Sequence, residues 1–153
     1  MRIAVMAAGA VGGYFGGRIA AAGHDVAFIA LGAHRDAIRR DGLKIESALG
    51  DLHLKDVNVT GDPTQVGPVD VVLFAVKLWD TETAGEQTRP LLDPESRVIT
   101  LQNGVDSVER LAPILGEKAT IAGTTCKYGV PTPAQEAVYA ILKPYRTGRG
   151  AKV

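Results

Sequence analysis

Residues 1–17 read MRIAVMAAGAVGGYFGG, and this stretch decides the fold. The apolar run from Arg2 to Met6 is typical of a buried strand, and a helical pattern follows it from Gly12 to Ala22. Between them lies Ala7-Ala8-Gly9-Ala10-Val11-Gly12, which we call the glycine turn. A second apolar strand, Asp25 to Ala30, completes a unit of about 30 residues, the length of a βαβ crossover.

Strand and helix patterns alternate along the rest of the chain. Helices are predicted over residues 34–40, 81–92 and 106–115, short strands over 43–59, and longer strands over 70–76, 97–101 and 119–123. The strand over 70–76 has no polar alternation, which favours a central position covered on both faces. The order predicts an α/β fold with a Rossmann-like, doubly wound and mostly parallel sheet.

The pattern changes after Thr125. Thr132 and Pro133 are typical of the start of a helix, and a final amphipathic helix is predicted from there, followed by a basic, glycine-rich tail over 146–153. We therefore predict two parts, a dinucleotide-binding domain over 1–125 and a C-terminal helix and tail over 126–153.

Composition excludes several classes of partner. Seventeen acidic residues balance seventeen Lys and Arg, so no overall field favours nucleic acid or an anionic membrane. The single cysteine excludes a disulfide framework, and no secretory or membrane-spanning pattern is found. We expect no nucleic-acid or membrane partner and a cytoplasmic location.

The glycine turn has the composition of a site for the diphosphate of a dinucleotide. In such turns the first glycine allows a tight bend, the second lets the phosphates approach the backbone, and the third lets the helix pack on the strand. Gly9 and Gly12 hold the second and third positions, but Ala7 holds the first. If that position needs a positive φ, the methyl group costs about 1 kcal/mol and weakens the site.

The end of the second strand bears on the choice between NAD and NADP. Sites for NAD usually carry an acidic residue there, whereas sites for NADP use an arginine. The strand ends Ala30-Leu31-Gly32, with neither. Arg35, Arg39 and Arg40 follow in the next helix, where they either contact a phosphate or form a solvated face.

Three motifs in order resemble one known family. These are the stretch from Met1 to His34, VDVVLFAVKLWDTETA from Val69, and ITLQNGVDSVERL from Ile99. Together they resemble the N-terminal half of ketopantoate reductase (2-dehydropantoate 2-reductase), an NADPH-dependent oxidoreductase of pantothenate biosynthesis. The resemblance covers about residues 1–125 and implies reduction of a small 2-keto acid, ketopantoate, to pantoate with NADP(H) as cofactor.

The resemblance also implies site residues. Lys77 and Asn103 correspond to family residues that line the cleft near the nicotinamide and substrate, and residues 7–12 and Leu31 correspond to cofactor contacts. Lys77 and Asn103 both follow apolar strands at the carboxyl edge, where open α/β sheets bind ligands. Without the family, a solvated strand end and an ordinary turn would be the favoured explanations of these two residues. Trp79 is interpreted as helix start and packing.

The chain departs from the family at several points. Ala7 replaces the family's glycine, and Leu31 replaces an arginine that meets the 2′-phosphate. The family's helical second domain, which carries the catalytic lysine, has no counterpart here, and neither Lys127 nor Lys143 matches that lysine. Residues 127–145 instead resemble the family's last helix, as in a truncated or internally shortened chain.

Two hypotheses follow from these observations. In the first, the chain supplies the cofactor-binding half of an NADP-dependent reductase. In the second, it is a non-catalytic nucleotide-binding or partner-binding remnant. In both, apolar surface that a second domain would cover predicts a homo-oligomer. No metal site is predicted, because His24, His34 and His53 lack the spacing of metal ligands.

Overall fold

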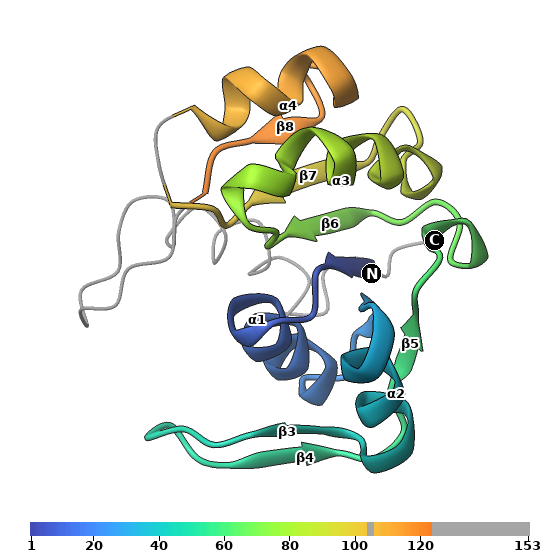
Figure 1. Ribbon diagram of the computed structural model, residues 1–153, viewed down its shortest axis with the longest axis vertical. Coiled ribbons are helices and arrows are strands. Elements are labelled where there is room, and N and C mark those ends of the chain that lie inside the picture. The colour runs from blue at the N-terminus through green and yellow to red at the C-terminus, as the bar shows by residue number, and fades with distance from the viewer. Residues whose placement is uncertain (104–105, 124–153) are drawn as a thin grey trace, which may run out of the picture.

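The computed structural model describes residues 1–103 and 106–123 and is built around one parallel sheet (Figure 1). The six strands lie in the order β5-β2-β1-β6-β7-β8. Their bounds are β1 Arg2–Met6, β2 Asp25–Ile29, β5 Asn58–Thr60, β6 Val71–Phe74, β7 Arg97–Thr100 and β8 Thr120–Ile121. Every neighbouring pair is parallel, as the predicted fold requires.

Helices cover the sheet on both sides (Figure 1). One layer contains α1 and α2, and the other contains α3 and α4. The bounds are α1 Ala10–Ala21, α2 Gly32–Asp41, α3 Thr81–Thr88 and α4 Ser107–Leu115, with short 3-10 turns η1 Pro63–Gln65, η2 Leu78–Asp80 and η3 Arg89–Leu91. An antiparallel hairpin, β3 Leu43–Ile45 and β4 Leu52–Leu54, packs against α1. Among the described residues, no helix is long and apolar enough to cross a bilayer.

The central strands are apolar on both faces because each face has its own core. Along β1, Ile3 and Val5 belong to the cluster beneath α1 and α2, whereas Ala4 and Met6 belong to the cluster beneath α3 and α4. Strand β6 alternates in the same way and is buried throughout. The absence of polar alternation in this strand was therefore a correct indication of a central, doubly covered position.

Helix α1 lies unusually close to the sheet because glycines face it. A Cβ at Gly16 would come within 2.6 Å of Val5 and 2.7 Å of Phe28, and one at Gly12 would collide with the Ala7 carbonyl oxygen. The third glycine of the turn therefore has the packing role that the sequence predicted.

The predicted elements match the observed ones with small shifts at their ends. The predicted helix over 81–92 is the exception, because α3 ends at Thr88 and η3 follows. Pro90 lacks the N–H that would continue the α-helical bonding at this point. The helix predicted from Thr132 and the boundary at residue 125 lie outside the described residues.

Candidate functional site

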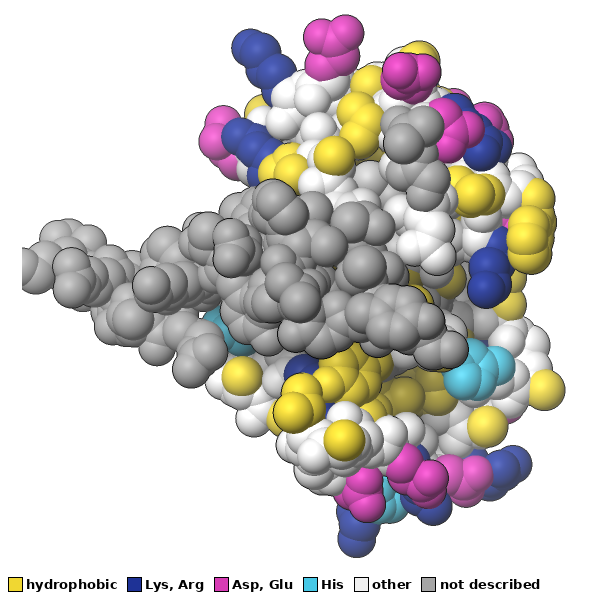
Figure 2. All heavy atoms as spheres, turned by 90° about the vertical axis from the view of Figure 1, so that its left-hand side faces the viewer, with side chains coloured by type: hydrophobic (Ala, Val, Ile, Leu, Met, Phe, Trp, Pro, Cys, Tyr) yellow, Lys and Arg dark blue, Asp and Glu magenta, His cyan; other side chains and the backbone are white. Residues whose placement is uncertain are grey.

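The order of the strands reverses direction at the centre of the sheet, which is where doubly wound sheets have their ligand-binding crevice. From β1 the chain proceeds outward through β2 and β5, then returns to the other side of β1 with β6 and proceeds outward again. The carboxyl ends of β1 and β6 therefore lie at the point where the direction reverses, where open α/β sheets bind ligands. Figure 2 shows this side of the molecule, with charged side chains of both signs toward its top and bottom.

The glycine turn leaves β1 at this edge in a strained conformation. Ala7 has a φ of 72°, and it is the one non-glycine residue with positive φ in the described parts of the chain. The Ala8 N–H donates to the Ile29 carbonyl at 2.9 Å, which fixes the turn against the end of β2. The sequence-based concern about Ala7 is thus correct in its physical basis, because this position does require the left-handed region.

The start of α1 leaves space above the backbone. Gly9 is the N-cap residue, and a Cβ built on it would meet no atom of residues 1–103 or 106–123 within 4 Å. The first turn of α1 carries no acidic side chain. An open helix N-terminus with its positive dipole end is suited to an anion such as a diphosphate.

His34, in α2, forms a hydrogen bond with the backbone of the glycine turn. Its Nε2 lies 2.7 Å from the Ala8 carbonyl oxygen. A carbonyl can only accept a hydrogen bond, so Nε2 carries the proton and donates. From the sequence, His34 was considered only as a metal ligand and this partner was not found, since the two residues are 26 positions apart.

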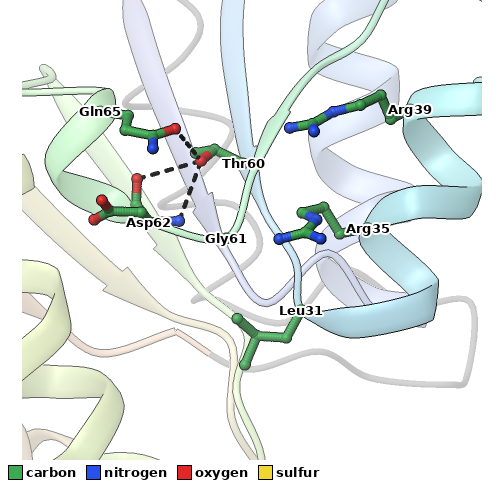
Figure 3. A pocket seen from close by; sticks show the side chains of 7 residues that line it. All are labelled: Leu31, Arg35, Arg39, Thr60, Gly61, Asp62 and Gln65. Atoms are coloured by element: carbon green, nitrogen blue, oxygen red, sulfur yellow. Dashed lines mark hydrogen bonds between the residues drawn. The ribbon is translucent and has the colours of Figure 1, made fainter.

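A pocket of about 420 Å³ opens between the start of α2 and the end of β5 (Figure 3). We call it the α2–β5 pocket, and it is lined by Leu31, Arg35, Arg39, Thr60, Gly61, Asp62 and Gln65. The guanidinium groups of Arg35 and Arg39 point from α2 toward the Thr60–Asp62 segment. Leu31 is 69% exposed at its mouth.

The charges of the α2–β5 pocket favour an anion. Arg35 pairs with Asp36 at 2.7 Å, and Arg39 donates to the Val59 carbonyl at 3.0 Å. The Asp62 carboxylate turns toward η1, where it accepts from the backbone N–H and the hydroxyl of Thr64.

Of the three arginines considered from sequence, Arg35 and Arg39 reach the pocket and Arg40 does not line it. Arg40 instead pairs with Asp41, whose carboxylate raises the pKa of Arg40 above its ordinary value.

Lys77 and Asn103 lie beyond neighbouring strands at the same edge. Phe74 of β6 pairs with Thr100 of β7, and each candidate residue follows its strand's member of that pair by three positions. Both side chains are exposed, and Lys77 is the residue from which η2 begins. Trp79, within η2, is 77% exposed, so its predicted packing role is wrong for the described residues.

Gln102, the residue before Asn103, has a position that the sequence interpretation did not consider. It is only 4% exposed, and its side-chain amide bonds to the segment that carries Lys77. A polar residue between a buried strand and Asn-Gly is the available sequence signal, but its partners are Val76, which follows β6, and Thr81, which begins α3. Within the described residues, no group of three His, Cys, Asp or Glu side chains could hold a metal ion.

The strand order and the glycine turn after β1 define a Rossmann-type α/β domain. Residues 3–141 match the family described as "Ketopantoate reductase PanE/ApbA", and the chain belongs to this family.

Curated relatives include a 2-dehydropantoate 2-reductase from Nostoc sp., 34% identical over 80% of this chain and 38% of the relative. One from Mesorhizobium japonicum is 36% identical over 69% of this chain and 32% of the relative. The chain therefore spans less than half the length of these relatives.

Solved structures show the same likeness. A 2-dehydropantoate 2-reductase from Geobacter metallireducens is 35% identical, with a TM-score of 0.78 over 88% of this chain and 44% of that one. A PanE/ApbA family ketopantoate reductase from Ralstonia eutropha is 33% identical, with a TM-score of 0.76 over 97% of this chain and 54% of that one. A D-mandelate dehydrogenase solved with NADH shares the fold at 22% identity.

Proposed function

We propose that this chain supplies the NADP(H)-binding half of an enzyme that reduces 2-dehydropantoate to pantoate. The observation that carries the proposal is the meeting of three features at one sheet edge: the glycine turn, Lys77 and Asn103. The relatives named above are 2-dehydropantoate 2-reductases, which gives the substrate class. The cofactor, when bound, supplies a hydride to the keto carbon.

The dinucleotide diphosphate fits the glycine turn. Backbone N–H groups at the start of α1 would hold it, and the open space at Gly9 lets it approach. Ala7 makes this turn less stable because its backbone is strained. It does not block the space that the diphosphate would occupy.

The α2–β5 pocket supports NADP over NAD. Leu31 stands where the family commonly has an arginine, but Arg35 lies one helical turn further along and lines the pocket. Arg35 and Arg39 together would neutralise the 2′-phosphate. The Asp62 carboxylate, which would repel it, is engaged with Thr64 instead.

Lys77 and Asn103 are proposed to contact the nicotinamide end of the cofactor and to orient the 2-keto acid beside it. An ammonium group that hydrogen-bonds the keto oxygen stabilises the negative charge that develops there as hydride arrives. The Asn103 amide would hold the substrate in line with the nicotinamide. Because Lys77 and Asn103 are exposed, a second domain would be needed to cover them and to deliver the proton to the keto oxygen. Turnover is therefore proposed only when such a domain is supplied.

Four further expectations remain predictions: a boundary between domains near residue 125, association of the chain with its own copies, a cytoplasmic location and no nucleic-acid partner. The first concerns residues outside those described.

The test is a titration of the chain with NADPH, followed by nicotinamide fluorescence. We expect saturable binding, with Lys77→Ala both weakening it and abolishing any oxidation of NADPH by 2-dehydropantoate. Lys118→Ala is the matched control, because it removes a lysine away from the crevice, between α4 and β8. Absence of saturable binding at millimolar NADPH would contradict the proposal.

A further inference from the structure

The backbone on both sides of Lys77 is held by one buried hydrogen-bond network. The Val76 carbonyl, directly before Lys77, accepts from Gln102 Nε2 at 3.2 Å. The Leu78 carbonyl, directly after it, accepts from the Thr81 hydroxyl at 2.8 Å. Gln102 Nε2 also donates to that hydroxyl at 2.8 Å, so the Gln102 amide is bonded directly to the Val76 carbonyl and is linked to the Leu78 carbonyl through Thr81.

The chemistry of the groups fixes the orientation of the Gln102 amide. The Val76 carbonyl can only accept, so the NH₂ end must face it. The Thr81 hydroxyl donates its only proton to the Leu78 carbonyl. Its oxygen must therefore accept the hydrogen bond from Gln102 Nε2. At the other end, Gln102 Oε1 accepts from the Thr100 hydroxyl at 3.3 Å. Both N–H donors of the Gln102 amide and one acceptor site on its oxygen therefore have partners.

Burial makes this network costly to break. Gln102 is 4% exposed, and Thr81 and Thr100 are fully buried. A buried donor or acceptor that loses its partner keeps its full desolvation penalty, so the segment around Lys77 has one favoured placement. Asn103 is the residue after Gln102, so the network that holds Gln102 also fixes the backbone from which Asn103 extends.

We propose that Gln102 is a positioning residue, which fixes the position of Lys77 relative to Asn103 at the carboxyl edge of the sheet. The role rests on the proposed function, since it acts through Lys77. Gln102 itself is buried beneath the edge, and its effect on ligands passes through the 76–81 segment.

The chain offers a matched pair of variants. Thr81 and Thr88 both belong to α3, both are fully buried, and both donate a side-chain hydrogen bond to a backbone carbonyl. Thr88 bonds to Ala84 within the helix and has no link to Gln102 among its hydrogen bonds. Thr81→Val thus breaks the network, whereas Thr88→Val removes an equivalent hydroxyl outside it. Gln102→Met removes the amide at similar volume.

The first measurement needs no cofactor. In ¹H–¹⁵N spectra of the chain, Thr81→Val and Gln102→Met are expected to shift the backbone resonances of both Lys77 and Asn103, and Thr88→Val to leave them in place. Unchanged Lys77 resonances in a folded Gln102→Met or Thr81→Val variant would overturn the inference.

The second measurement is a double-variant cycle on NADPH affinity. Gln102→Met is expected to weaken NADPH binding about 3- to 10-fold in the original chain, and less than about twofold in a chain that already carries Lys77→Ala. Equal effects in both backgrounds, or an equal effect of Thr88→Val, would overturn the positioning role. Lack of NADPH binding by the unaltered chain, or an unchanged affinity in Lys77→Ala, would instead overturn the proposed function.

Discussion

At the residue scale, Ala7 stores strain in the glycine turn. Its φ of 72° lies in the left-handed region, which costs a non-glycine residue about 1–2 kcal/mol. Glycine removes that strain but gains about 0.5–1 kcal/mol of conformational freedom in the unfolded chain. We expect Ala7→Gly to raise the free energy of unfolding by about 0.5–1 kcal/mol in urea titrations and to tighten NADPH binding.

Ala8→Gly is the control for this substitution. Ala8 is buried and has no positive φ, so glycine there adds unfolded-state freedom and removes a packed methyl group. Both effects destabilise, by about 1–2 kcal/mol in total. If Ala7→Gly lowered stability as Ala8→Gly should, the strain assigned to Ala7 would be wrong.

The preference for NADPH over NADH is predicted to depend on Arg35. Arg35→Gln is expected to weaken NADPH binding about tenfold, a value reduced by its exposure and its pairing with Asp36. NADH lacks the 2′-phosphate, so its affinity should stay within about twofold. Leu31→Arg should act in the opposite direction and tighten NADPH alone.

Arg40→Gln serves as the matched control, because Arg40 lies in the same helix but pairs with Asp41 and does not line the α2–β5 pocket. An equal loss of NADPH affinity in Arg35→Gln and Arg40→Gln would point to general charge rather than to the pocket.

Residue contacts were predicted from sequence only where they are local. The strain at Ala7 followed from its place in the glycine turn, and the role of Gly12 followed from its spacing. The partner of His34 in the glycine turn and the partners of Gln102 on either side of Lys77 lie 21 to 26 positions away, and spacing along one segment gives no information about them. The 77% exposure of Trp79 was missed for the same reason, since only the fold decides what covers a side chain.

At the scale of elements, one ion pair joins the two helices that cover the β6–β7 side of the sheet. Arg110 of α4 donates to both carboxylate oxygens of Glu82 in α3, at 2.7 and 2.8 Å. The Arg110 guanidinium lowers the pKa of Glu82 from 4.5 to about 2. Among the described residues, Asp106 at the start of α4 makes no side-chain cap bond, and its carboxylate lies 3.9 Å from Arg110.

The lowered pKa of Glu82 gives a prediction for stability against pH. A carboxyl whose pKa is lower in the folded state stabilises the fold above pH 4.5 and loses that effect as the pH falls toward 2. We expect Glu82→Gln to lower the melting temperature slightly at pH 7, with the difference from the original chain disappearing between pH 4.5 and 2. The exposure of the pair keeps the effect small.

Arg110→Gln breaks the same pair from the other side and should follow the same pH course. A deficit in Glu82→Gln that persisted unchanged at pH 2 would indicate a loss of packing rather than of the ion pair. The double variant should be no less stable than the worse single variant, because both remove one interaction.

At the scale of the whole molecule, the doubly wound topology is what turns scattered motifs into one site. The glycine turn, the Lys77 segment and Asn103 are far apart in sequence, yet parallel strands in this order bring them to one edge. The alternation of strands and helices predicted this architecture, since few other arrangements bury apolar strands on both faces. It did not predict the α2–β5 pocket, which depends on how η1 turns back toward α2.

Two large apolar side chains, Leu31 and Trp79, are exposed on segments that follow β2 and β6 at the carboxyl edge, at 69% and 77%. Exposed apolar surface at an edge favours association. Trp79 is the chain's only tryptophan, so its fluorescence reports directly on whether this edge is covered.

We expect the chain to sediment as an oligomer at tens of micromolar. Its tryptophan emission should move toward the blue as concentration rises, because association removes water from Trp79. Trp79→Ser should shift the chain toward monomer, whereas Leu49→Ser, which alters an exposed leucine beyond β3 in the hairpin, should leave the distribution unchanged. A monomer with constant, red-shifted emission over the whole range would contradict self-association and leave the edge open for a different domain.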